Sequence, residues 1–237
     1  MSVPDATGLL RHRDRIEGDL VVEVAFTDVS LSLGDAAAAG VRTAALDALA
    51  GATGATPVLM HQVHGAEVSL MGGEVGAAMP SCDAMVTSRP GVALLARAAD
   101  CVPVLLADPA TGWIAAVHAG RPGLAAGVVP AAVTRLREQG AAPSVAWVGP
   151  HVCGACYEVP AALQEEVAAL VPEARSTTSW GTPALDLGAG VRAQLAAARI
   201  ADVRVVDVCT REDASWPSYR RDGAAATRFA GLIWSHP

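Results

Sequence analysis

The chain has 237 residues and a mass of 24.0 kDa, and 52% of its residues are hydrophobic, which is enough to form one sizeable core. Its formal net charge is -7, its pI is near 5.3, and lysine and arginine form no long run. Nucleic acids and anionic membrane surfaces are therefore not expected as partners, whereas small molecules are.

The sequence predicts a soluble protein of the reducing cytoplasm. Mean hydropathy is +0.36, yet charged residues interrupt the most apolar region before it reaches the length of about 20 residues that spans a bilayer. Charges alternate over 11–17, where a signal peptide needs an apolar core. The five cysteines are then free or metal-bound, and their odd number argues against a complete set of disulfides.

Hydrophobic patterning predicts one α+β domain. Residues 1–18 are polar and lack periodicity, so we expect an N-terminal tail, partly disordered, ahead of a domain over 19–237. Apolar runs predict strands at 20–26, 57–60, 66–71, 84–87, 92–96, 102–107, 113–117, 144–148 and 203–208, and a short apolar run at 229–234 closes the chain. Helices are expected at 36–50, over 124–136, after Pro160 and after Asp186, with Pro130 either kinking the second helix or starting a new one.

Three residues that could ligate a metal stand where apolar runs meet turns, namely His64, Cys101 and His118. Two imidazoles and a thiolate could hold one zinc ion and leave a position open for water, which is the pattern of catalytic zinc sites. Asp100 supports this interpretation, because a carboxylate in an apolar sequence is costly to bury without a cation or a strong donor beside it.

Each of these residues also has a purely structural interpretation. A histidine at a strand end is commonly a hydrogen-bonded structural group, and a free cysteine is commonly a small buried hydrophobe. His61 lies three residues before His64, and an odd separation on a strand places two side chains on opposite faces. We therefore do not expect these two histidines to share a metal.

Cys153 and Cys156 form a C-x-x-C pair. A thioredoxin-like redox site needs a helix directly after such a pair, but the segment that ends at Pro160 delays any helix. The sequence shows no matching second pair downstream that would complete a zinc site. We therefore expect these cysteines to pack a loop.

A polar, basic cluster occupies residues 218–222. Such a cluster is ordinarily a solvated loop. Here the adjacent Arg220 and Arg221 follow an aromatic residue, and guanidinium groups bind phosphate oxygens bidentately. The cluster is therefore a candidate site for a phosphate or a stacked base.

A series of short motifs resembles, in order, the laccase-domain family, which was named polyphenol oxidoreductase and is regarded as purine nucleoside phosphorylase and adenosine deaminase. The motifs are His61-Gln-Val-His-Gly65, Asp83-Ala-Met-Val-Thr87, Ala99-Asp-Cys-Val-Pro103, His118-Ala-Gly120, Gly149-Pro150 with Tyr157-Glu-Val159, Leu185-Asp-Leu187, Cys209-Thr210 and Ser218-Tyr-Arg-Arg-Asp222. The resemblance covers roughly residues 20–234.

The resemblance implies a fold, a metal and an activity. The fold would be a four-layer α/β/β/α sandwich, and the metal would be a single zinc ion held by His64, Cys101 and His118. The activity would be phosphorolysis of adenosine and related purine nucleosides, with adenosine deamination as a further activity. Copper is the less favoured metal.

The remaining candidate site residues would serve the substrates. We expect Arg220 and Arg221 to position phosphate for attack at the anomeric carbon of the ribose. Gln62 is a candidate contact for the nucleoside, and Asp100 is the candidate acid and base for deamination. The expected partners are thus a nucleoside and phosphate.

The chain departs from the family around the substrate rather than at the metal. The Arg-containing, glycine-rich loop that usually follows the first strand is missing between residues 26 and 34. Ser32 replaces the usual asparagine, and Arg121-Pro122-Gly123 replaces Trp-Arg-Gly. If the missing arginine helps to hold phosphate, these changes weaken or alter phosphorylase activity.

Three other functions stay open. A copper-dependent polyphenol oxidoreductase needs several copper sites, for which six histidines supply few ligands. A metal-free cysteine hydrolase would use Cys101 as nucleophile and His118 as base. A non-catalytic zinc-binding protein would keep the metal but lack a formed substrate pocket.

Overall fold

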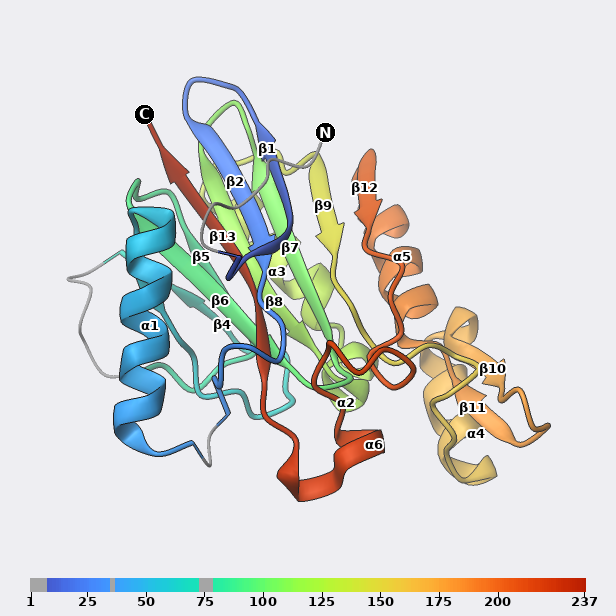
Figure 1. Ribbon diagram of the computed structural model, residues 1–237. Helices are drawn as coiled ribbons and strands as arrows, with labels where there is room; N and C mark the ends of the chain where they lie inside the picture. The colour runs from blue at the N-terminus through green and yellow to red at the C-terminus, as the bar shows by residue number, and fades with distance from the viewer. Residues whose placement is uncertain (1–7, 35–36, 73–78) are drawn as a thin grey trace.

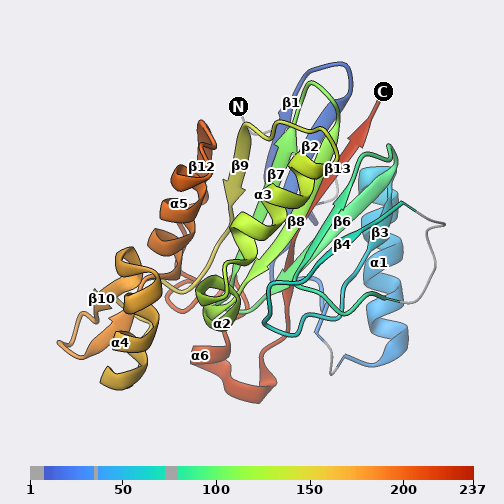
Figure 2. The same cartoon turned by 180° about the vertical axis from the view of Figure 1, so that it is seen from behind.

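The computed structural model describes residues 8–34, 37–72 and 79–237, and within these ranges two β-sheets are stacked face to face (Figure 1). Helix α1 (Ala39–Thr53) covers the outer face of one sheet. Helices α2 (Arg121–Ala125), α3 (Val128–Glu138) and α5 (Leu187–Ala197) cover the outer face of the other (Figure 2). This order of layers confirms the expected α/β/β/α sandwich.

The first sheet has the strand order β1-β2-β13-β6-β3. Its strands are β1 (Arg11–Ile16), β2 (Val21–Phe26), β13 (Phe229–His236), β6 (Val92–Ala98) and β3 (Thr56–Val58). Neighbouring strands are antiparallel except β3 and β6, which are parallel. The C-terminal strand β13 therefore lies in the middle of the sheet, where it pairs with β2 from the N-terminal part of the chain.

The second sheet has the order β12-β9-β7-β8-β5-β4. Its strands are β12 (Asp202–Val205), β9 (Val145–Val148), β7 (Val102–Asp108), β8 (Trp113–Ala119), β5 (Ala84–Thr87) and β4 (Val68–Leu70). The remaining elements are α4 (Ala161–Leu170), β10 (Arg175–Thr177), β11 (Pro183–Leu185), α6 (Tyr219–Asp222) and 3-10 turns at Pro172–Ala174 and Gly223–Ala225. In the described part of the chain, no helix has the length and apolarity that crossing a membrane requires.

Strand β6 shows why the central apolar runs do not alternate with polar residues. One face of β6 packs through Leu94 into the layer between the sheets, and the other face packs through Leu95 toward α1. Phe26 from the first sheet and Met85 from the second sheet fill the same inter-sheet layer. A strand covered on both faces is apolar along nearly its whole length, and in β6 the exception is the buried Arg97.

The ends of the helices follow local backbone chemistry. Helix α1 continues to Thr53, because Gly54 adopts a φ of 66° and forms a left-handed cap. The helix expected over 124–136 is two helices, separated by Gly127 with a φ of 81°. Pro130 lies in the first turn of α3, where a backbone amide has no helical acceptor in any case.

The sequence predicted an N-terminal tail over 1–18. This prediction is wrong for residues 11–16, which form strand β1 at the edge of the first sheet. The Arg13 guanidinium on β1 donates to the Glu23 carboxylate on β2 at 2.7 Å. Backbone pairing with β2 thus forms a strand here without an apolar periodicity, and cross-strand charge pairs of this kind add to it. Residues 1–7 of the expected tail, and residue 36 of the expected first helix, lie outside the described residues.

Phe26 offers a test of the packing between the sheets. The residue is fully buried, and its ring lies close against Gly149 and Gly231. We expect Phe26→Ala to lower the free energy of unfolding by about 3–5 kcal/mol in urea denaturation, because the sheets cannot close over the lost ring. Val41→Ala on α1, at a side chain that is 51% exposed, should change that free energy by less than about 0.5 kcal/mol. Equal effects of the two variants would contradict this packing.

Candidate metal centre

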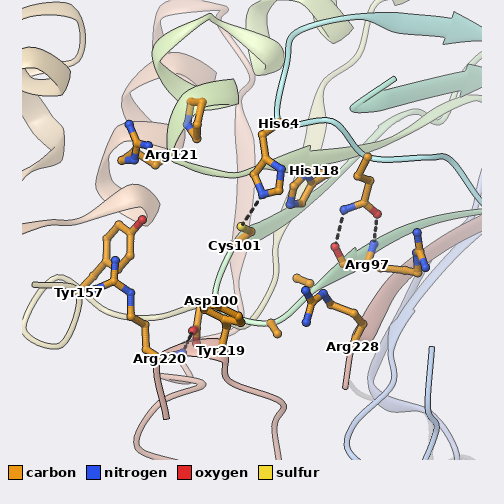
Figure 3. A pocket seen from close by; sticks show the side chains of 14 residues that line it. His64, Arg97, Asp100, Cys101, His118, Arg121, Tyr157, Tyr219, Arg220 and Arg228 are labelled. Atoms are coloured by element: carbon orange, nitrogen blue, oxygen red, sulfur yellow. Dashed lines mark hydrogen bonds between the residues drawn. The ribbon is translucent and has the colours of Figure 1, made fainter. Parts of the chain in front are cut away.

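Three segments that are far apart in the sequence bring His64, Cys101 and His118 together, with ligand atoms that all lie within 4.8 Å of one another (Figure 3). Strands β7 and β8 are antiparallel and Pro103 lies opposite His118, so the residue that precedes β7 meets the end of β8. His64 reaches both from the loop between β3 and β4. His61 does not belong to this group.

Asp83 orients two of the three candidate ligands. Its carboxylate lies 2.8 Å from His118 Nδ1, which fixes the ring and leaves Nε2 as the nitrogen free for a ligand. The same carboxylate accepts the backbone N–H groups of Val63, His64 and Gly65 at 3.2, 3.0 and 2.6 Å. One buried side chain therefore holds both the His118 ring and the loop that carries His64.

The electrostatics of this pair favour a neutral imidazole and an ionised carboxylate. Burial lowers the pKa of His118, although the hydrogen bond to Asp83 acts in the opposite direction. Burial works to raise the pKa of Asp83, but hydrogen bonds from His118 and from the Gly65 and His64 amides outweigh it and hold this pKa below its usual value. A neutral imidazole is the form that binds a metal.

The surroundings of Cys101, in contrast, disfavour the thiolate, which is the form that binds a metal. Burial, reinforced by the charge of Asp100, raises the pKa of the Cys101 thiol to about 12. The group is therefore a thiol at neutral pH unless a cation lies beside it. His64 Nε2 is 4.0 Å from the Cys101 sulfur, too far for strong activation by a base. This environment does not favour a metal-free cysteine nucleophile, whereas a metal cation would stabilise the thiolate.

The backbone around the three side chains is strained and tightly packed. His64 and Asp100 have φ values of 61° and 89°, in the left-handed region that residues with a side chain rarely adopt. Gly120 has no room for a side chain, because a Cβ there would lie 2.7 Å from His64 Cδ2 and 3.1 Å from the Cys101 sulfur. Only glycine at this position lets the chain pass so close to the candidate ligands.

A cavity of about 590 Å³ opens beside the three candidate ligands, within the usual size range of small-molecule sites. Figure 3 shows the charged and aromatic side chains around it. They are Arg97, Asp100, Arg121, Tyr157, Tyr219, Arg220 and Arg228. The cavity thus combines a cluster of soft and borderline metal ligands with cationic groups suited to an anion.

Asp100 lies on the wall of this cavity, where two donors fix its carboxylate. The Thr210 hydroxyl donates to Oδ1 at 2.7 Å, and the Arg220 backbone N–H donates to Oδ2 at 2.6 Å. These hydrogen bonds connect the residue next to Cys101 with the segment at 218–222 that the sequence singled out. They also offset the cost of burying the carboxylate.

The structure separates the two adjacent arginines. Arg220 lines the cavity with its guanidinium 4.3 Å from the centre of the Tyr157 ring. The Arg221 guanidinium is not among the cavity-lining groups, and it donates instead to the carbonyl oxygens of Thr210 at 2.7 Å and Trp216 at 2.8 Å. Those contacts hold the loop together.

Gln62 lines the cavity, but its amide is engaged with the backbone. Its Nε2 donates to the Arg97 carbonyl at 2.8 Å, and its Oε1 accepts the Arg97 N–H at 2.9 Å. The Arg97 guanidinium in turn donates to the carbonyl oxygens of Leu33 and Met60. Gln62 therefore ties the loop before His64 to the end of β6.

Sequence reasoning did not assign a role to Asp83, Arg228 or Tyr157, which the structure places at or beside the cavity. Asp83 could have been found by the argument used for Asp100, because it too is a lone carboxylate at the start of an apolar strand. Arg228 stands alone before β13, and nothing in its local sequence signals that it faces the cluster.

Comparisons with known proteins agree with this architecture. The family described as multi-copper polyphenol oxidoreductase laccase matches residues 14–236. A purine nucleoside phosphorylase of Streptomyces coelicolor is 54% identical over 180 residues, which are 75% of this chain and 74% of the relative. A purine nucleoside phosphorylase of Mycobacterium tuberculosis is 44% identical over 202 residues, which are 84% of this chain and 80% of the relative.

Solved structures show the same fold. A DUF152 protein from Neisseria meningitidis superposes with a TM-score of 0.83 at 26% identity and covers 96% of this chain and 100% of that one. YlmD from Geobacillus stearothermophilus gives a TM-score of 0.82 at 24% identity, with 99% and 100% covered. The chain belongs to the laccase-like polyphenol oxidoreductase family.

The central place of Asp83 yields a prediction about metal affinity. Asp83→Asn exchanges one acceptor oxygen for an NH2 group that faces backbone N–H donors, so the loop of His64 and the ring of His118 lose their common support. We expect zinc affinity, measured by competition with a chromophoric chelator, to fall about 10- to 100-fold.

Asp108 supplies the matched control. It is equally buried and accepts the Thr111 hydroxyl and the amides of Ala110 and Ala142, but it lies at the opposite end of β7 from Cys101. Asp108→Asn should destabilise the fold without changing zinc affinity. An equal loss of affinity in both variants would show that Asp83 acts only through global stability.

Proposed function

We propose that this protein is a zinc-dependent purine nucleoside phosphorylase that acts on adenosine and related nucleosides. The observation that carries the proposal is the convergence of His64, Cys101 and His118 on the wall of an arginine-lined cavity. Zinc held by these residues would supply a Lewis acid with one coordination position open. The relatives named purine nucleoside phosphorylase support this choice of reaction.

The donor set bears on the choice between zinc and copper. Two imidazoles and one thiolate also suit copper(II), so the ligands alone admit either metal. A multi-copper oxidase, however, needs several imidazole-rich sites. Within the described residues the only other group of candidate ligands contains three cysteines and a glutamate and no histidine. We therefore propose one zinc ion in place of a set of coppers.

Arg228 is our candidate for the phosphate site. Its side chain lines the same cavity as His64, Cys101 and His118 (Figure 3). Ser32, in the shortened loop, hydrogen-bonds the neighbouring Thr227 at 2.8 Å and steadies this segment. We infer that Arg228, with Arg220, supplies the cationic charge that the missing loop arginine would provide.

The other lining groups suit a nucleoside. Tyr157 and Tyr219 offer aromatic faces on which a purine can stack, and Gln62, whose amide is bonded to the Arg97 backbone, also lines the cavity. We retain Gln62 as a substrate-contacting candidate through its exposed edge, and we assign Arg221 to holding the loop. Ordering both substrates in line is itself worth roughly 7–11 kcal/mol in the best cases.

Asp100 supports a second activity, hydrolytic deamination of adenosine. Its carboxylate lies on the cavity wall next to Cys101, and two fixed donors orient it. Each oxygen keeps a further lone pair that can accept a proton from water or a hydrogen bond from a substrate amine. We propose Asp100 as the acid and base of this reaction.

Chromatography of adenosine incubated with the zinc-loaded protein tests both activities. Phosphorolysis gives adenine and ribose 1-phosphate only when phosphate is present, and deamination gives inosine with or without phosphate. We expect adenine as the main product, and we expect His118→Ala to abolish it, because that variant removes a metal ligand held by Asp83.

His61→Ala is the matched histidine control, since His61 is exposed and lies outside the ligand group. This variant should keep full activity. Activity that survives in His118→Ala, or in protein stripped of metal, would contradict the proposal. A blue absorption band and phenol oxidation after copper loading would instead support the oxidase.

The proposed role of Arg228 predicts a phosphate-specific defect. Arg228→Gln removes a charge-assisted hydrogen bond of about 1.5–3 kcal/mol, so kcat/KM for phosphate should fall about 10- to 100-fold while zinc content is unchanged. Arg42→Gln on α1 is the control for losing an arginine far from the cavity. An unchanged phosphate dependence in Arg228→Gln would assign phosphate to another arginine.

A further inference from the structure

A second cluster of ligand-type side chains lies outside the cavity described above. The sulfur atoms of Cys153, Cys156 and Cys209 and a carboxylate oxygen of Glu212 all lie within 4.8 Å of one another. The sequence predicted that the C-x-x-C pair packs a loop, because no second pair follows it. The structure supplies the missing half as C-x-x-E, beginning 56 residues after Cys153.

The two halves of the cluster have the same backbone turn. The amides of Cys156 and Tyr157 both donate to the Cys153 carbonyl at 3.0 Å. The amides of Glu212 and Asp213 both donate to the Cys209 carbonyl, at 3.2 and 3.0 Å. A turn with this pattern projects its first and fourth side chains to one side, which is the geometry of the paired ligands in zinc-binding turns.

The second sheet brings the two turns together. Strands β9 and β12 are parallel neighbours, and the chain beyond each strand continues the pairing through a bridge between His151 and Cys209. The Cys153 amide donates to the Cys209 sulfur at 3.3 Å, and the Cys156 thiol donates to the Glu212 carboxylate at 3.3 Å. The four ligand atoms are therefore gathered by the fold and not by chance contacts at a surface.

The turn that carries Cys153 and Cys156 is also tightly packed against neighbouring elements. A Cβ at Gly154 would lie 2.6 Å from the Ser176 hydroxyl and 2.8 Å from the Asp186 side chain. Asp186 is itself fixed as the cap of α5, where it accepts the Ala189 amide at 2.7 Å. The position of Cys153 and Cys156 is thus set by rigid elements on both sides.

We propose that Cys153, Cys156, Cys209 and Glu212 form a second, structural zinc site, distinct from the site at His64. Three thiolates and one carboxylate give four ligands of the types that zinc takes in closed tetrahedral sites, with no position left for substrate. Binding releases the three thiol protons to solvent, so the site forms more readily as pH rises. Arg211, whose guanidinium donates to the Cys156 carbonyl at 3.3 Å, lies near the resulting negative charge.

This zinc ion would stabilise one wall of the cavity. Thr210 follows Cys209 directly and donates to the Asp100 carboxylate at 2.7 Å. Tyr157 follows Cys156 directly, and its ring lies under Arg220. A metal that joins the two turns therefore fixes the positions of Asp100 and Arg220 without touching the substrate.

Metal content per chain tests the proposal. By mass spectrometry of the purified, reduced protein supplied with zinc, Cys209→Ser should contain one zinc ion fewer than the wild type. His118→Ala, which affects only the other site, should keep the ion at the cysteine cluster. Cys82→Ser, at a buried cysteine beside Met60, should keep the wild-type content. If Cys209→Ser retains the wild-type content while circular dichroism shows a folded protein, the second site does not exist.

Thiol protection in the wild-type chain provides a measurement that does not depend on how a variant folds. With zinc bound, iodoacetamide should modify Cys153, Cys156 and Cys209 at least 10-fold more slowly than after chelation. Equal rates with and without zinc would overturn the proposal, and so would a disulfide within the cluster that, once reduced, takes up no zinc. Because neither result involves turnover, this site can fail while the proposed phosphorylase stands, and the reverse also holds.

Discussion

The buried carboxylate of Asp83 is the group on which the proposed metal centre depends. It accepts hydrogen bonds from one histidine ring and three consecutive backbone amides, and it is itself inaccessible to solvent. Burying an ionised carboxylate costs several kcal/mol, and hydrogen bonds to a charged group, worth about 1.5–3 kcal/mol each, offset that cost. Its ionised form also explains how two histidines from distant segments are held ready before any metal binds.

The fold converts this local arrangement into a cavity. The antiparallel pairing of β7 and β8 places Cys101 beside His118, and the segment at 218–222 closes over Asp100. Strand β13 lies between β2 and β6, so Arg228, just before β13, is held next to the loop after β2, where Ser32 hydrogen-bonds Thr227.

Much of the architecture could be predicted from the sequence, because the apolar runs are short and clearly bounded. The strands of both sheet centres and the capped helix α5 follow directly from such patterns. Strand β1 was missed because its residues are mostly charged and leave no apolar periodicity, although its backbone pairs with β2 at the edge of the first sheet. The order of strands in the sheets comes from long-range pairing, which local patterns do not encode.

The candidate site was predictable to a similar degree. His64, Cys101 and His118 could be selected because each stands where an apolar run meets a turn, a place where a ligand-type residue is informative. The different positions of Arg220 and Arg221 could not be foreseen, since adjacent residues on a short helical turn point in different directions. The relation between Cys153 and Cys209 depends on the parallel pairing of β9 and β12, and no motif in the sequence reports it.

The proposed activity depends on one zinc ion bound among His64, Cys101 and His118. Anomalous diffraction recorded on either side of the zinc absorption edge, from crystals of protein supplied with zinc and copper together, tests it most directly. We expect an anomalous peak at the zinc edge within bonding distance of the two imidazole nitrogens and the Cys101 sulfur. Anomalous signal from copper at that position, or no signal there while all three side chains are well ordered, would contradict it.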